Sequence, residues 1–64
     1  MLHFIETKKL GKDKHAVLWQ RGDYNYEIEV LDFSVGNPYE QQIVTYKYPD
    51  TAFETVYLIF QNEY

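Results

Sequence analysis

The fold is set by the stretch Tyr24-Asn25-Tyr26-Glu27-Ile28-Glu29-Val30-Leu31-Asp32-Phe33. Up to Val30, apolar residues at even positions alternate with polar residues at odd positions. This period of two is typical of a β-strand with one buried face and one solvated face. At Leu31 and Phe33 the parity is reversed, which predicts either a β-bulge or the end of the strand.

The residues that precede this strand predict its partner. Residues 15–21 are rich in β-branched and aromatic side chains, which favours a second strand. Between the two strands, Arg21-Gly22-Asp23 supplies residues that are common in turns. We therefore predict a β-hairpin.

Two further strands are expected, one before and one after the hairpin along the chain. Residues 2–7 form a short apolar segment that predicts a first strand, and the polar residues 8–14 around Gly11 predict a loop after it. Residues 34–39 contain Gly36 and Asn37-Pro38, which also predict a loop. Residues 41–48 are rich in strand-forming residues and are followed by Pro49, which predicts a fourth strand.

A helix is expected over residues 51–62. Thr51 and Glu54 have the spacing of a capping box, and Asp50 is an alternative cap. At helical spacing one broad apolar stripe appears, with Leu58 on the opposite side; the stripe contains Ala52, Phe53, Val56, Tyr57, Ile59, Phe60 and Tyr64. Because several of these residues also favour strands, an extended C-terminus is the alternative.

This order of elements predicts an α+β fold. We expect a small antiparallel β-sheet of three to four strands, covered on one face by the C-terminal helix, in a single domain over residues 1–64. A chain of 64 residues without Cys has no disulfides to supplement a small core, and aromatic residues make up 19% of it. Such a domain depends on good packing or on association with another chain.

Charge is unevenly distributed along the chain. Residues 1–21 hold five basic and two acidic side chains, whereas residues 22–64 hold one basic and eight acidic ones, within a net charge of −4. The predicted loop carries Lys8, Lys9, Lys12 and Lys14, with His15 and Trp19 close in sequence, a combination that suits weak nucleic-acid binding. The acidic side chains Glu27, Glu29, Asp32 and Glu40 suggest a second nucleic-acid-related role, in which they imitate DNA phosphates. The plainer interpretation of both groups is a solvated surface.

No pattern in the sequence predicts catalysis or a cofactor. His3 and His15 are the only histidines and, without Cys, are poor zinc ligands. Glu27 and Glu29 share one strand face and have the separation of an acid–base pair, but the solvated side of a strand is the simpler interpretation. The tripeptide Arg21-Gly22-Asp23 matches the integrin-binding motif, although its position in a turn explains it equally well.

The surplus of tyrosines points to association with another protein. We expect a non-enzymatic interaction domain that pairs with itself or with a protein partner, through Tyr39, Tyr46, Tyr48 and Leu58. An open edge at the first or fourth strand would assist this association. We expect no cofactor, no membrane segment and a cytoplasmic location. In its short, acidic, Tyr-rich composition the chain resembles the accessory proteins of bacteriophages and mobile elements.

Overall fold

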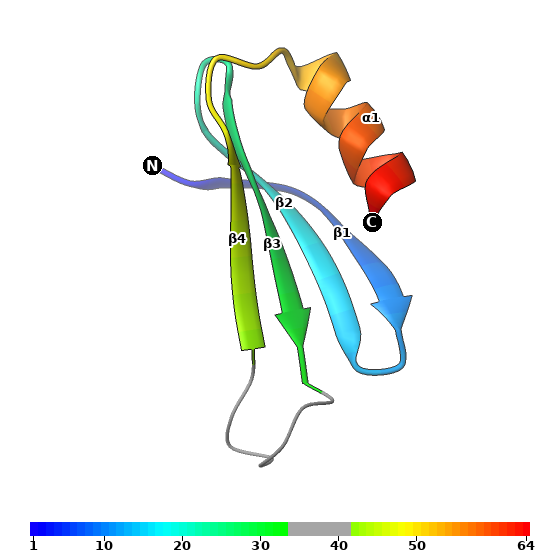
Figure 1. The fold of residues 1–64 in the computed structure, drawn as a ribbon. Helices are drawn as coiled ribbons and strands as arrows, with labels where there is room; N and C mark the ends of the chain where they lie inside the picture. The colour runs from blue at the N-terminus through cyan, green and yellow to red at the C-terminus, as the bar shows by residue number, and fades with distance from the viewer. Residues whose placement is uncertain (34–41) are drawn as a thin grey trace.

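A four-stranded antiparallel sheet and one C-terminal helix make up the fold in the computed structural model, which describes residues 1–33 and 42–64. The strands follow one another in the sheet in chain order, with α1 packed against one side (Figure 1). Their bounds are β1 His3–Gly11, β2 Lys14–Gly22, β3 Asn25–Asp32, β4 Gln42–Tyr48 and α1 Phe53–Glu63. The predicted α+β class is therefore confirmed.

Strands β2 and β3 form the predicted hairpin, and the structure places them as the two central strands of the sheet. Leu18 pairs with Ile28 and Trp19 pairs with Glu27, so even-numbered residues of both strands share one face. The pairing of β3 with its neighbours shows no register shift after Val30, which excludes the predicted β-bulge. The reversed parity instead precedes the end of β3 at Asp32. At the turn, the residue with positive φ is Tyr24, at 55°.

The first strand is longer than the sequence predicted, and the expected loop over residues 8–14 is wrong. Strand β1 continues to Gly11 and β2 begins at Lys14, so only Lys12 and Asp13 form the turn. The lysines misled the prediction because an edge strand needs only backbone pairing, while long charged side chains can extend into water.

Residues 53–63 are helical, and the extended alternative for the C-terminus is excluded. The predicted capping box is wrong: the N-cap residue is Ala52, and its side chain makes no capping hydrogen bond. The Thr51 hydroxyl instead donates to the Pro49 carbonyl at 2.8 Å, and the Thr51 amide donates to the Tyr24 carbonyl at 2.8 Å. The segment before α1 is thus bonded within itself and to the β2–β3 turn, and the Thr51 hydroxyl is engaged there instead of capping the helix.

The core lies between α1 and one face of the sheet, called here the covered face. Six buried residues form it: Ala16, Leu18, Tyr26, Ile28, Val56 and Phe60. Full burial of a side chain such as Leu18 or Phe60 stabilises a fold by roughly 1.5–3 kcal/mol. The opposite face, called the open face, carries the odd-numbered residues of β2, β3 and β4, and no described helix or strand lies over it.

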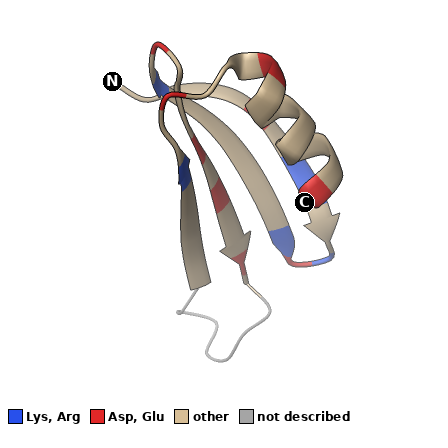
Figure 2. Ribbon diagram, turned by 45° about the horizontal axis from the view of Figure 1, so that its top comes forward, with Lys and Arg blue, Asp and Glu red and all other residues tan. Residues whose placement is uncertain are grey.

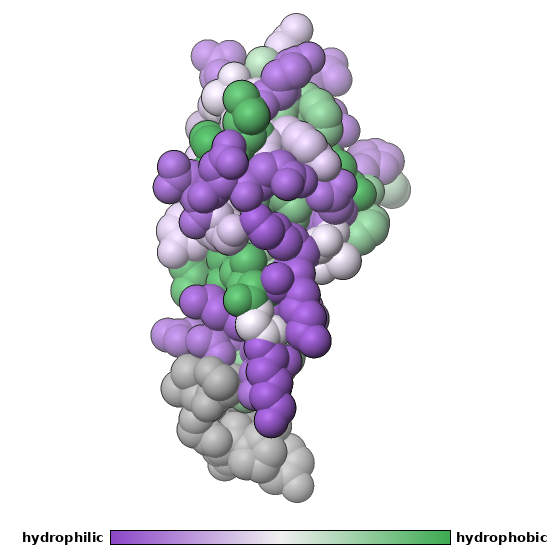
Figure 3. All heavy atoms as spheres, turned by 90° about the vertical axis from the view of Figure 1, so that its right-hand side faces the viewer, coloured by the Kyte–Doolittle hydropathy of each residue, from purple (hydrophilic) through white to green (hydrophobic). Residues whose placement is uncertain are grey.

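Charged residues are grouped on the fold rather than scattered. Acidic side chains follow β3 and lie at both ends of α1, while basic side chains gather near the β1–β2 turn (Figure 2). Viewed from the side of α1 and β1, hydrophilic residues form a band broken by small hydrophobic patches (Figure 3). Within residues 1–33 and 42–64, no helix has the length and apolar character needed to span a membrane.

Candidate interaction site

Strand β4 is an exposed and regular edge of the sheet. Its residues from Gln42 to Lys47 are all exposed, including Ile43 at 48% and Tyr46 at 45% of their full surface. It pairs with β3 through seven consecutive residue pairs without any register shift. Natural edge strands are commonly shielded by bulges, charges or prolines. The only such residue on β4 is Lys47.

The other edge, β1, is shielded. Its pairing with β2 shifts register twice, between Phe4 and Glu6 and between Lys9 and Gly11. Such irregularities bend a strand and interrupt its row of backbone donors and acceptors. Lys8 and Lys9 add charge to the same strand. Of the two edges, β4 is therefore the one that another strand can join.

The direction of the backbone groups on β4 follows from one hydrogen bond just after the C-terminal end of β3. The Phe33 amide donates to the Asp13 carbonyl at 2.8 Å, which makes Lys14 and Asp32 a non-hydrogen-bonded pair between β2 and β3. Because bonding alternates along an antiparallel strand, the even-numbered residues of β3 bond to β4. Their partners are the even-numbered residues of β4. Ile43, Thr45 and Lys47 consequently direct their N–H and C=O groups to the open edge.

The structure brings two of the four predicted contact residues together. Tyr46 and Tyr48 lie two residues apart on β4, on the covered face, and both reach Tyr64 after the helix. The rings of Tyr46 and Tyr64 are 5.7 Å apart, and the hydroxyl oxygens of Tyr48 and Tyr64 are 3.1 Å apart. Burial raises the pKa of the Tyr64 phenol, and the hydrogen bond with Tyr48 adds to this effect. Tyr46 and Tyr48 thus join the helix end to β4 and are not only surface residues.

The other two predicted contact residues do not join this group. Leu58 is 61% exposed, as predicted, but it is two residues from both Val56 and Phe60 and so lies on the side of α1 that faces away from the sheet. Tyr39 lies outside the described residues, as does Glu40. The predicted contact residues therefore do not form one continuous surface within the part of the chain that the structure describes.

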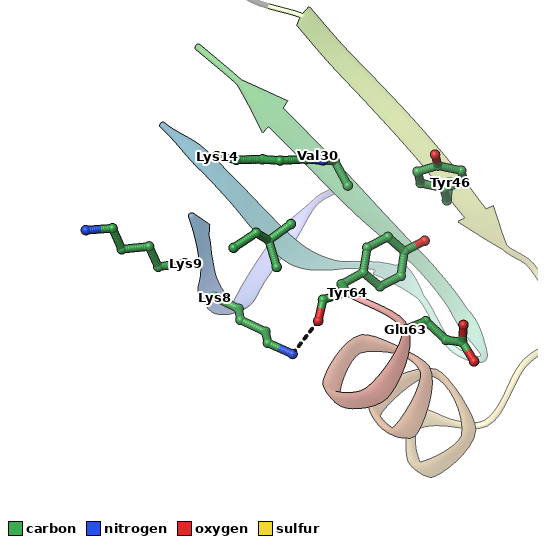
Figure 4. A pocket seen from close by; sticks show the side chains of 8 residues that line it. Lys8, Lys9, Lys14, Val30, Tyr46, Glu63 and Tyr64 are labelled. Atoms are coloured by element: carbon green, nitrogen blue, oxygen red, sulfur yellow. Dashed lines mark hydrogen bonds between the residues drawn. The ribbon is translucent and has the colours of Figure 1, made fainter. Parts of the chain in front are cut away.

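Three of the four lysines of the predicted basic loop border one groove, and the fourth lies in a turn. Lys8, Lys9 and Lys14 line a groove of about 530 Å³ beside the end of α1 (Figure 4). Lys12 is in the β1–β2 turn. The Lys8 ammonium donates to the main-chain oxygens of Gln61 at 2.8 Å and Tyr64 at 2.6 Å. A helix end leaves such oxygens without intrahelical partners. Lys8 therefore stabilises the end of α1 instead of providing a free cation.

A second contact fixes the outer part of α1 to β1. The Tyr57 hydroxyl donates to the Glu6 carboxylate, with oxygen distances of 3.0 and 3.2 Å, and the Gln61 amide donates to the same carboxylate at 3.2 Å. The hydrogen bond to Glu6 raises the pKa of the Tyr57 phenol, and burial adds to this effect. Sequence reasoning missed this contact and the role of Lys8, because no sequence signal relates residues more than fifty positions apart.

On the open face, the expectation that Glu27 is solvated is wrong. The Glu27 residue is only 6% exposed and its carboxylate is ion-paired with the Arg21 guanidinium. The Arg21 hydrogen bond lowers the pKa of the Glu27 carboxyl, burial opposes this change, and the nearby Lys47 assists it. Glu29, two residues along β3, is partly exposed. An acidic surface built on both residues would therefore have little of the Glu27 charge available.

Aromatic rings occupy the two ends of the open face. The ring centroids of Phe4 and Trp19 are 5.9 Å apart in an edge-to-face arrangement, and those of His15 and Phe33 are 6.4 Å apart. Lys9 lies beside His15 as its cross-strand partner. This end of the sheet therefore combines rings with a cation, as the sequence suggested for His15.

The remaining sequence motifs do not assemble into a site. His3 is on β1 near the N-terminus, paired with Gln20, and is distant from His15 in the register of the same two strands. Within residues 1–33 and 42–64, no three His, Asp or Glu side chains are grouped closely enough to hold a metal ion. In the tripeptide 21–23, Arg21 is engaged by Glu27 and Gly22 ends β2.

Comparison with protein-family models, with curated proteins and with solved structures finds no match to this chain. The open β4 edge, with Tyr46 and Tyr48 upon it, is thus identified as the candidate site from the geometry alone.

Proposed function

We propose that this protein is a small, non-enzymatic interaction domain that binds another polypeptide strand at the edge of β4. The observation that supports the proposal is the regular, exposed β4 edge, with the backbone groups of Ile43, Thr45 and Lys47 directed outward. In strand addition, main-chain hydrogen bonds provide affinity and alternate side chains provide specificity. Tyr46 is well placed for the second role because it is half-exposed on this strand.

The proposal is tested by removing one outward donor from the edge. Thr45→Pro removes an N–H that bonds to no other strand of the sheet, so the β3–β4 pairing should survive. Thr45→Val is the matched control, because it keeps the N–H and favours a strand. In affinity purification from the native host and in light scattering, wild type and Thr45→Val should retain an associated chain that Thr45→Pro loses. Equal association of all three, or none by any at high micromolar concentration, would refute the proposal.

A second candidate is weak binding of single-stranded nucleic acid. It is favoured by the ring pair of His15 and Phe33 beside Lys9, at the end of the sheet where Lys12 also lies. Bases stack on aromatic rings, and phosphates attract lysines in a salt-dependent manner. Fluorescence titration with a labelled oligonucleotide should then show affinity that decreases with salt and is reduced in Lys9→Gln. Indifference to the oligonucleotide at low salt would remove this candidate.

A further inference from the structure

We infer that the strand that joins β4 is the β4 strand of a second copy of this chain, in an antiparallel pair centred on Thr45. The inference rests on the proposed function and names the partner of the same site. It requires that two β4 strands are complementary to each other in backbone bonding, in side-chain contacts and in charge.

The backbone groups of β4 are compatible with self-pairing. Ile43, Thr45 and Lys47 direct their donors and acceptors outward, as derived from the β2–β3 and β3–β4 ladders. In an antiparallel pair centred on Thr45, each of these residues meets an outward-directed residue of the partner: Thr45 meets Thr45, and Ile43 meets Lys47. All residues of Gln42–Tyr48 are then paired, which no other centre allows.

The side chains also match in this register. On the covered face, Val44 of each copy meets Tyr46 of the other, a combination of β-branched and aromatic side chains of the type that stabilises a sheet. Val44 and Tyr46 are 39% and 45% exposed, so each has surface left to bury. A two-fold axis perpendicular to the sheet keeps both helices on the same side.

Charge disfavours the neighbouring register centred on Lys47. Lys47 is the only charged residue on β4 and is close to the Glu27 carboxylate of its own chain. A pair centred on Lys47 would place two like charges opposite each other, which destabilises a sheet. The pair centred on Thr45 places Lys47 beside Ile43, and the two lysines are about 13 Å apart along the strands.

The other edge of the sheet favours a closed dimer over a filament. If β4 of one copy joined β1 of the next, the contact would repeat without limit. The two register shifts in β1, with Lys8 and Lys9 on it, make that strand a poor acceptor. Pairing of β4 with β4 uses the one regular edge of each copy and leaves only shielded edges.

The experiment uses single cysteines in a chain that has none. Opposed residues of a hydrogen-bonded pair have Cα atoms about 5.5 Å apart, within the range of a disulfide. Under mild oxidation, Thr45→Cys should convert to a covalent dimer, whereas Ile43→Cys alone should not, because its two copies are about 13 Å apart along the strands. The double variant Ile43→Cys/Lys47→Cys should regain the covalent dimer.

The outcomes distinguish a failure of the Thr45 register from a failure of the proposed function. Faster cross-linking of Ile43→Cys than of Thr45→Cys would overturn the Thr45 register, while strand addition at β4 would stand. A monomer at every concentration, with no cross-linking of any variant, would overturn the second copy as partner. In that case the comparison of Thr45→Pro with Thr45→Val in host extracts would still decide whether β4 binds another protein.

Discussion

The packing of α1 on the sheet can be tested by comparing two substitutions on the same helix. Val56 is fully buried in the core, whereas Leu58, one residue beyond Tyr57, is 61% exposed on the opposite side. Val56→Ala removes two buried carbon groups, and each costs roughly 0.5–1.5 kcal/mol when the core does not fully collapse. The higher helix propensity of Ala returns up to about 0.7 kcal/mol. We expect the free energy of unfolding to decrease by about 1–2 kcal/mol.

That loss is large for a domain of this size, whose core supplies roughly 3–5 kcal/mol. It should lower Tm by roughly 4–16 °C, measured by circular dichroism at 222 nm. Leu58→Ala should change the free energy of unfolding by less than about 0.5 kcal/mol. Both variants are compared in urea at two protein concentrations, so that any effect on association is separated from folding. Equal destabilisation by the two variants, or a larger effect from Leu58→Ala, would refute the orientation of the helix.

Three further predictions concern polar contacts. Lys8→Met removes a cation from the end of α1 and should increase amide exchange in the last helical turn, whereas Lys9→Met should not; equal exchange in both would contradict the role of Lys8. Arg21→Gln leaves the Glu27 carboxylate buried without its partner and should lower stability at pH 7. Because the pKa of Glu27 is lowered in the folded protein, the stability from this pair is present above the unfolded pKa near 4 and is lost as the pH falls through the folded value. Urea titrations of wild type and Arg21→Gln should therefore converge in acid, and a constant difference from pH 7 to pH 2 would contradict the pairing. The raised pKa of Tyr64 contributes stability that is present below the unfolded pKa near 10 and is lost at higher pH, so Tyr64→Phe should reduce the loss of stability between pH 10 and pH 12.

The sequence predicted those parts of the fold that have a local period. The alternation up to Val30 predicted β3 and the residues of its covered face, although Tyr24 lies in the turn and Glu27 on the other face is buried. The helical stripe containing Val56 and Phe60 predicted the side of α1 that is buried. Both patterns depend only on residues a few positions apart in the sequence. They are therefore the same whatever the order of the strands in the sheet. The lysines around Gly11 misled the prediction because their polarity is the same in a loop and in an edge strand.

Only the tertiary structure decided where the candidate site lies. The order and register of all four strands make β4 the regular edge and β1 the irregular one. They also direct the backbone groups of Ile43, Thr45 and Lys47 outward. The burial of Glu27 and the contact of Lys8 with the end of α1 likewise join residues brought together by folding. A sequence determines which residues alternate, because the period of a strand is local. It does not by itself reveal which strand remains without a neighbour, because that property belongs to the whole sheet.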